Sequence, residues 1–148
     1  MGKSMIMLVG GIVLLFVALV VLYFTFPKKG YDTNIEIIEI SSPNNSSKLY
    51  IKKKTWGMTG DGQVIVVSNE GNNIFEPDST SEYIFKGLSP LLYKVEKDTL
   101  VLYVYQASQV PANLKSDFVV RQIELENPEM MKLIENDNYK QQGLIIVK

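Results

Sequence analysis

The chain has 148 residues, of which 15 are basic and 16 acidic, and it contains no histidine and no cysteine. Without these two residue types, Ser-His-Asp and Cys-His catalysis are excluded, as is zinc, haem or iron–sulfur ligation by Cys or His. The remaining options are chemistry by carboxylates, lysine, tyrosine or serine, or by a hard cation on oxygen ligands.

A long apolar run occupies residues 5–26 and carries no charged side chain. At a rise of about 1.5 Å per residue, a helix of this length spans roughly 33 Å and matches a bilayer core about 30 Å thick. Pro27 and the lysines that follow end the run, because proline cannot continue a helix and lysines avoid hydrocarbon. We therefore predict a transmembrane helix at 5–26, in contact with the lipid bilayer and preceded by a short tail at 1–4.

Two other interpretations of this run fit less well. A cleaved signal peptide has a shorter apolar core, of about 7–15 residues, and small residues at its cleavage site, whereas Phe26 and Pro27 end this run. Acylation lacks a cysteine, and Ile6 stands where the myristoylation pattern needs Ser or Thr. The chain is therefore predicted to be a single-pass membrane protein with an uncleaved anchor.

The orientation of this anchor depends on a nearly balanced charge comparison. Lys3 and the α-amino group on one side face Lys28 and Lys29 on the other, and the lysines at 48 and 52–54 favour a cytoplasmic C-terminal domain. Short chains with one N-terminal anchor, however, commonly hold their domain outside. We predict an extracytoplasmic domain.

Residues 27–34 are interpreted as a linker, and residues 35–148 as one globular domain of a size that can bury a core. Residues 31–148 hold 12 of the 15 basic side chains and all 16 acidic ones, which gives a net charge of −4. Arg121 is the one arginine of the chain. Nucleic-acid binders normally carry a basic excess rich in arginine, so that class is disfavoured.

Runs of β-branched, aromatic and alternating apolar residues, separated by Gly, Pro and Asn, predict strands in this domain. In chain order the predicted strands are residues 35–40, 48–56, 63–68, 82–86, 91–96, 99–106, 118–126 and 144–147. Ile37 and Ile38 break the alternation and indicate a bulge, and the lysines at 52–54 are typical of an edge strand. The run at 100–105 is the most strand-like and is predicted to be central.

The other segments supply a loop and a helix. Residues 69–81 are polar and predict an exposed loop. Asn127 as cap and Pro128 as first helical residue predict a helix start, and Gly143 predicts its end. The whole pattern predicts an N-terminal transmembrane helix plus a mainly-β (α+β) domain, an antiparallel sheet or small sandwich with one C-terminal helix.

Four constellations could carry a site, and each has a simpler structural explanation. Gly57, Gly60 and Gly62 do not match a phosphate-binding spacing, and a hairpin beside a core tryptophan explains them better. The other three are an oxygen-rich stretch, two carboxylate pairs and a set of strand tyrosines. Their members are Asp61, Glu70, Asn72, Asn73, Glu76 and Asp78; Asp61 with Glu70 and Glu82 with Glu96; and Tyr50, Tyr83, Tyr93, Tyr103 and Tyr105.

The oxygen-rich stretch lacks EF-hand spacing, so a solvated acidic loop is favoured over a calcium site. Solvated strand charges explain the carboxylates, and core packing explains the tyrosines. Asn44 and Asn45 begin two overlapping N-x-S sequons, which matter only in a glycosylating secretory pathway. We therefore predict no catalytic, cofactor-binding or metal-binding residues.

Three function hypotheses follow. The first is a membrane-anchored, non-enzymatic module that contacts another membrane or envelope protein. The second is an immunity-type inhibitor of a membrane-acting toxin, which a small acidic domain would suit. The third is an enzyme that uses carboxylates or lysine. The first agrees best with a dedicated anchor, an aromatic-rich sheet and the missing His and Cys.

Overall fold

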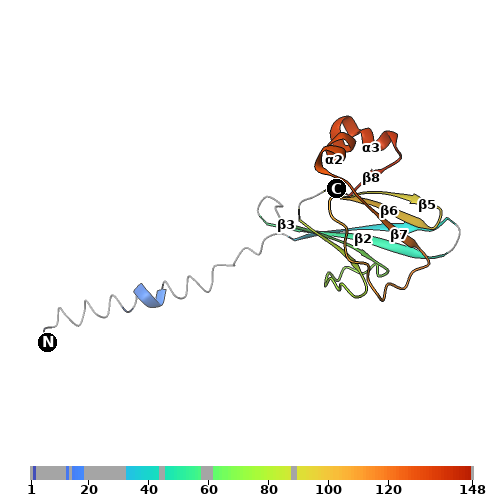
Figure 1. Cartoon of the computed structure of the whole chain (residues 1–148). Helices are drawn as coiled ribbons and strands as arrows, with labels where there is room; N and C mark the ends of the chain where they lie inside the picture. Colours follow the sequence, from blue (N-terminus) through green and yellow to red (C-terminus); the bar gives the residue numbers. More distant parts are fainter. Residues whose placement is uncertain are drawn as a thin grey trace. The chain divides into compact units, whose positions relative to one another are not determined.

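A computed structural model of the chain describes residues 33–43, 46–57, 62–87 and 90–147, together with Gly2, Val13 and residues 15–18 (Figure 1). Residues 31–148 form a compact unit by themselves. Val13 and residues 15–18 are helical and exposed, and the rest of the predicted span at 5–26 lies outside the described residues. Within the described parts of the chain, no helix has both the length and the apolar character needed to cross a membrane.

The first sheet is a four-stranded antiparallel meander in the order β1-β2-β3-β4. Its strands are β1 (Asn34–Ser41), β2 (Lys48–Trp56), β3 (Gly62–Ser68) and β4 (Tyr83–Lys86). Alternation of apolar residues gives each strand one face for the core, and short polar connections allow sequential strands to pair. All four strands were predicted from the sequence, with boundaries that differ by one residue at most.

The second sheet has the order β7-β6-β5-β8 and is mixed. Its strands are β5 (Leu92–Glu96), β6 (Thr99–Val104), β7 (Val119–Glu124) and β8 (Ile145–Ile146). β5 pairs antiparallel with both β6 and β8, whereas β6 and β7 run parallel, from Thr99 opposite Val119 to Val104 opposite Glu124. The crossover at residues 105–118 is long enough for a parallel connection. The central position predicted for residues 100–105 is confirmed for β6.

The two sheets pack face to face around one core, so of the two predicted arrangements, an antiparallel sheet or a small sandwich, the structure has the sandwich, and its second sheet is mixed and not antiparallel. Buried side chains from both sheets belong to the same cluster, and these are Ile40, Leu49, Ile51, Ile65, Val67 and Tyr83 from the first sheet, with Leu91, Tyr93, Leu100, Leu102, Val104, Phe118 and Val147 from the second half of the domain. Burial of this apolar surface from both inner faces is the main favourable term for a sandwich.

Helices cover one end of the outer face of the second sheet, beside β8 (Figure 1). They are α2 (Asn127–Ile134), the short 3-10 turn η1 (Glu135–Asp137) and α3 (Asn138–Gln141). Met130 and Tyr139 pack with Leu92 and Leu144 in a second apolar cluster. The predicted cap is one residue off, because Glu126 is the N-cap and its N–H donates to the Glu129 carboxylate at 3.0 Å. Gly143 has φ +68°, which agrees with its predicted role as the helix stop.

The outer face of the first sheet is covered by a loop, residues 69–82, which we call the covering loop. Beneath it Val66 and Ser68 are 1% exposed. Gly71 lies so close to the Tyr50 ring that a Cβ atom there would overlap it. The prediction of a plain exposed loop was therefore incomplete: most of its side chains are exposed, but its backbone closes over the sheet.

Two predictions about these strands were wrong. The β1–β2 register runs without interruption from Asn34 opposite Thr55 to Ser41 opposite Lys48, so no bulge occurs at Ile37 and Ile38. The lysines at 52–54 do not mark an edge, because β2 is an inner strand of its sheet. Their alternation places Lys52 under the covering loop, where it is 4% exposed.

Candidate functional site

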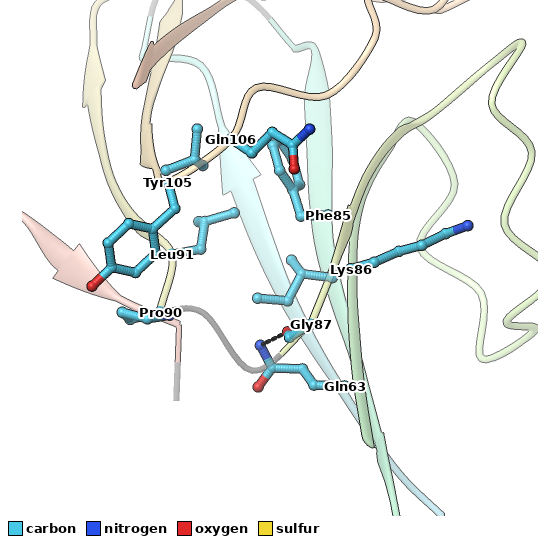
Figure 2. Close-up of a pocket in the computed structure, with 10 residues that line it drawn as sticks. Gln63, Phe85, Lys86, Gly87, Pro90, Leu91, Tyr105 and Gln106 are labelled. Carbon is cyan, nitrogen blue, oxygen red and sulfur yellow. Dashed lines mark hydrogen bonds between the residues drawn. The ribbon is translucent and has the colours of Figure 1, made fainter. Parts of the chain in front are cut away.

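A small cleft of about 120 Å³ opens where the two inner faces of the sandwich meet the surface (Figure 2). Four separate segments contribute to it: β3, the end of β4, the residues before β5, and the end of β6. The residues around the cleft are Gln63, Ile65, Phe85, Lys86, Gly87, Pro90, Leu91, Val104, Tyr105 and Gln106. Because the lining residues range from Gln63 to Gln106 and come from both sheets, the cleft exists only in the folded sandwich.

The cleft floor is an extension of the core. Ile65 and Phe85 are opposite each other in the β3–β4 register and face inward. Leu91, which precedes β5, and Val104 of β6 are buried members of the central cluster, against which Phe85 packs. At the cleft the inner faces of the two sheets are therefore not fully covered, and aliphatic and aromatic side chains are available to a bound group.

Polar groups at the cleft are fixed or point elsewhere. The Gln63 side-chain amide donates to the Gly87 carbonyl at 3.3 Å, and the Tyr105 hydroxyl donates to the Asn127 side-chain oxygen at 3.0 Å. Figure 2 shows the Lys86 side chain running away from the other lining residues. No carboxylate is found among the lining residues that the structure describes. The cleft can hold an apolar group, but it presents no acid–base pair.

Of the two carboxylate pairs considered from the sequence, Glu82 and Glu96 have different partners and do not pair with each other. Glu82 is the last residue of the covering loop, and one of its carboxylate oxygens is 3.6 Å from the Lys52 ammonium while the other accepts the Asp78 N–H at 3.0 Å. Glu96 sits in the other sheet and pairs with Lys94 at 2.6 Å, a contact that lowers the pKa of Glu96. Asp61 lies outside the described residues.

The oxygen-rich stretch is organised by hydrogen bonds within the loop. The Asp78 carboxylate accepts from the Thr80 N–H at 3.0 Å, the Thr80 hydroxyl at 2.7 Å and the Ser81 hydroxyl at 2.8 Å. The Thr80 contacts, followed by the one from Ser81, lower the pKa of Asp78. Glu70 accepts from the Asn72 amide at 3.0 Å. Among the described residues, no group of three or more Asp and Glu side chains is arranged to hold a metal ion.

The glycines flanking the β2–β3 turn have structural roles. Gly57 has φ +103°, a conformation that favours glycine. A Cβ atom at Gly62 would overlap the Trp56 indole, so glycine is needed there for the ring to lie flat on the strand. Trp56 is 38% exposed, which corrects the prediction of a core tryptophan. Gly60 lies outside the described residues.

The strand tyrosines are mostly structural, as predicted. Tyr83 and Tyr93 are 5% exposed in the central cluster, and burial raises the pKa of both phenols, with the nearby Glu36 charge adding to the effect at Tyr93. Tyr103 and Tyr105 pack against the helix cluster. These positions leave no continuous row of exposed tyrosines among them.

No protein-family model matches this chain, and comparisons with curated proteins and with solved structures found no match either. The candidate site therefore depends on geometry alone. The sequence had not singled out Phe85, Pro90, Leu91 or Gln106, because nothing in their spacing shows that four segments converge. The break in apolar cover at the ends of the predicted strands was the one available signal.

Proposed function

We propose that this chain is a membrane-anchored, non-enzymatic binding module, in which the β-rich domain holds an apolar side chain of another membrane or envelope protein. The observation that supports this proposal is the size and lining of the cleft. Pockets for small molecules usually occupy about 300–1,000 Å³. A cleft of about 120 Å³ is too small for most metabolites but suits one large side chain.

Single side chains that fill such pockets often dominate the energy of a protein interface. The cleft supplies the matching partner surface, with Phe85 and Leu91 as apolar walls and the Gln106 amide at the edge. An enzyme using carboxylates or lysine is less well supported, because the described carboxylates lie elsewhere and Lys86 runs away from the cleft.

The anchor at 5–26 is part of the same proposal. Confinement to a bilayer raises the effective concentration of a domain toward partners in that bilayer, so a shallow cleft with modest affinity would suffice. We place the domain on the extracytoplasmic side. A cysteine introduced at the exposed Ser46 should react with an impermeant thiol reagent in intact cells, and protection of that cysteine would contradict this orientation.

Site-specific photocrosslinking in the native membrane tests the binding function. Benzoylphenylalanine at Gln106, on the cleft edge, should give one stoichiometric adduct with a second protein. The same group at Gln141, exposed on α3, is the matched control and should give none.

A Gln63→Trp variant would fill the cleft and should abolish the adduct while the near-ultraviolet circular dichroism remains that of a folded domain. An adduct that persists in this variant, or that forms equally from Gln141, would exclude the cleft as the binding site.

A second candidate, the immunity-type inhibitor, is favoured by a groove along the covering loop that Glu70, Glu76 and Asp78 line together with Lys115. Acidic grooves attract basic partners and speed their association. Under this hypothesis, deletion of the chain should be harmful only when a basic toxin is present, and Glu76→Gln should weaken protection. Harm from the deletion without any toxin would contradict it.

A further inference from the structure

One corner of the first sheet combines basic and apolar side chains on its outer face. The strand registers align Ile35, Lys54, Val64 and Lys86 in one row across all four strands, on the face opposite the core. Trp56 follows in the next outward row, opposite Gly62. We call these five residues, with Phe75 of the covering loop, the basic–aromatic corner.

Trp56 and Lys86 are the exposed members of the corner, whereas Ile35, Lys54, Val64 and Phe75 are half-buried. Trp56 is 38% exposed and its indole lies over Gly62, while Lys86 is exposed at the end of β4. The Lys54 ammonium lies 5.5 Å from the centre of the Phe75 ring. Among the described residues, these two rows carry no carboxylate, since Glu36 belongs to the inward-facing set. The described side chains of these two rows therefore contribute two positive charges, Lys54 and Lys86, although residues 31–148 carry a net charge of −4.

This combination matches the chemistry of a lipid head-group layer. Tryptophan places its ring at the boundary between hydrocarbon and water, and lysines interact with the phosphates of anionic lipids. Each lysine close to an anionic surface strengthens membrane association by about five-fold. A soluble acidic protein partner would satisfy the lysines, but it would not require an exposed indole beside them.

The predicted linker between the anchor and β1 is short. Seven residues, 27–33, separate the predicted anchor from Asn34, and eight fully extended steps cover at most about 28 Å. Asn34 pairs with Thr55, so β1 begins at the end of the sheet that carries Trp56. The predicted linker therefore joins the domain at the end of the first sheet that carries the corner.

We propose that the basic–aromatic corner docks on the head groups of an anionic bilayer and fixes the orientation of the domain on its membrane. The proposal rests on the membrane anchor of the proposed function and adds a second contact with the same bilayer. Docking turns the domain from a freely tethered module into one that presents its remaining surfaces in a fixed direction.

The single tryptophan of the chain provides a direct readout. The full-length protein is reconstituted into vesicles of phosphatidylcholine with or without phosphatidylglycerol, in which both leaflets are alike and insertion direction does not matter. With phosphatidylglycerol, Trp56 emission should shift to shorter wavelength and should be quenched by lipids brominated near the top of the acyl chain. High salt should reverse both effects.

The matched variants separate charge at the corner from charge elsewhere. Lys54→Gln with Lys86→Gln should reduce quenching to the level seen in pure phosphatidylcholine. Lys97→Gln with Lys132→Gln removes the same charge from exposed sites outside the corner and should leave quenching unchanged.

Three results would overturn the proposal. Equal emission in both vesicle types, with full access to aqueous acrylamide, would show that Trp56 faces water. Shielding from acrylamide without quenching by brominated lipid would place a protein on the corner. Failure of the chain to resist alkaline carbonate extraction would refute the anchor and the proposed function with it, whereas the first two results refute the docking alone.

Discussion

The two outer faces of the sandwich are covered in different ways. On the second sheet the cover is helical and apolar, with Met130 and Tyr139 packed on Leu92. On the first sheet the cover is a loop, secured by the Lys52–Glu82 ion pair, by a bond from Lys52 to the Ile74 carbonyl at 3.4 Å, and by the turn around Asp78. Apolar burial is spread over many small contacts, whereas a buried ion pair concentrates its effect in a few atoms.

The two covers can therefore lose stability in response to different changes. The helical cover should respond to substitutions in proportion to the volume removed. The loop cover should respond to charge and to pH, since its contacts are polar. Three measurements test whether the two covers differ in this way.

The largest effect is expected at the buried ion pair. Lys52→Met keeps the aliphatic stem but leaves Glu82 charged and buried, so the free energy of unfolding should fall by about 4 kcal/mol. Chemical denaturation of the domain measures the change. The double variant Lys52→Met with Glu82→Gln should recover most of the loss, because no unpaired charge remains.

Lys48→Met is the matched control for this pair, because Lys48 and Glu39 form an exposed pair at 2.7 Å. No measurable change is expected from it. If the double variant Lys52→Met with Glu82→Gln is as unstable as Lys52→Met alone, packing of the lysine stem, and not the pairing of charge, holds the covering loop.

A somewhat smaller effect is expected under the helices. Met130 is fully buried, and Met130→Ala should cost about 3 kcal/mol through lost burial and the cavity left behind. The neighbouring Met131 is 53% exposed, so Met131→Ala should change stability by less than about 0.5 kcal/mol. If urea denaturation shows that both variants lower the free energy of unfolding by a similar amount, α2 does not pack on the sheet through Met130 as described.

The smallest effect concerns the pH response of the covering loop. Hydrogen bonds from Thr80 and Ser81 lower the pKa of Asp78 below its ordinary value of 3.8. The charged carboxylate therefore stabilises the turn fully above that value, and the contribution is lost as the pH falls through the lowered pKa. Amide exchange at Thr80, corrected for intrinsic rates, should speed up below about pH 4.

Asp78→Asn is the control for this titration, because it removes the charge at every pH. In that variant exchange at Thr80 should be faster throughout and should lose its acid step. An unchanged acid step would assign the response to another group.

Much of the fold could be predicted from local pattern. Every strand had a signal in its β-branched and apolar residues, and Pro128 and Gly143 marked the helix region. Strand order was less accessible, because lysines at 52–54 look the same on an edge and on an inner strand whose outer face a loop covers. The parallel β6–β7 pair carries no local signal, since its polarity depends on the route of residues 105–118.

The candidate site was harder to predict than the fold. The cleft needs Phe85 and Leu91 to meet across two sheets, and no spacing in the sequence encodes that distance. A core position was predicted for Trp56 because tryptophan is usually well buried, but its position at the end of β2 leaves the indole half covered. The missing His and Cys, by contrast, limit the available chemistry through composition alone.

The topology of the two sheets also bears on how the domain reaches its native state. The first sheet is complete within residues 34–86 and consists of neighbours in sequence, so its hairpins close short loops. The second sheet is complete only when β8 has been added, because Leu92 pairs with Ile146 and the Val147 N–H donates to the Leu91 carbonyl at 2.9 Å. Contacts this distant in sequence slow folding. During synthesis the meander would form early with its inner face uncovered, which makes the interval before β8 docks the period of greatest exposure to misassembly.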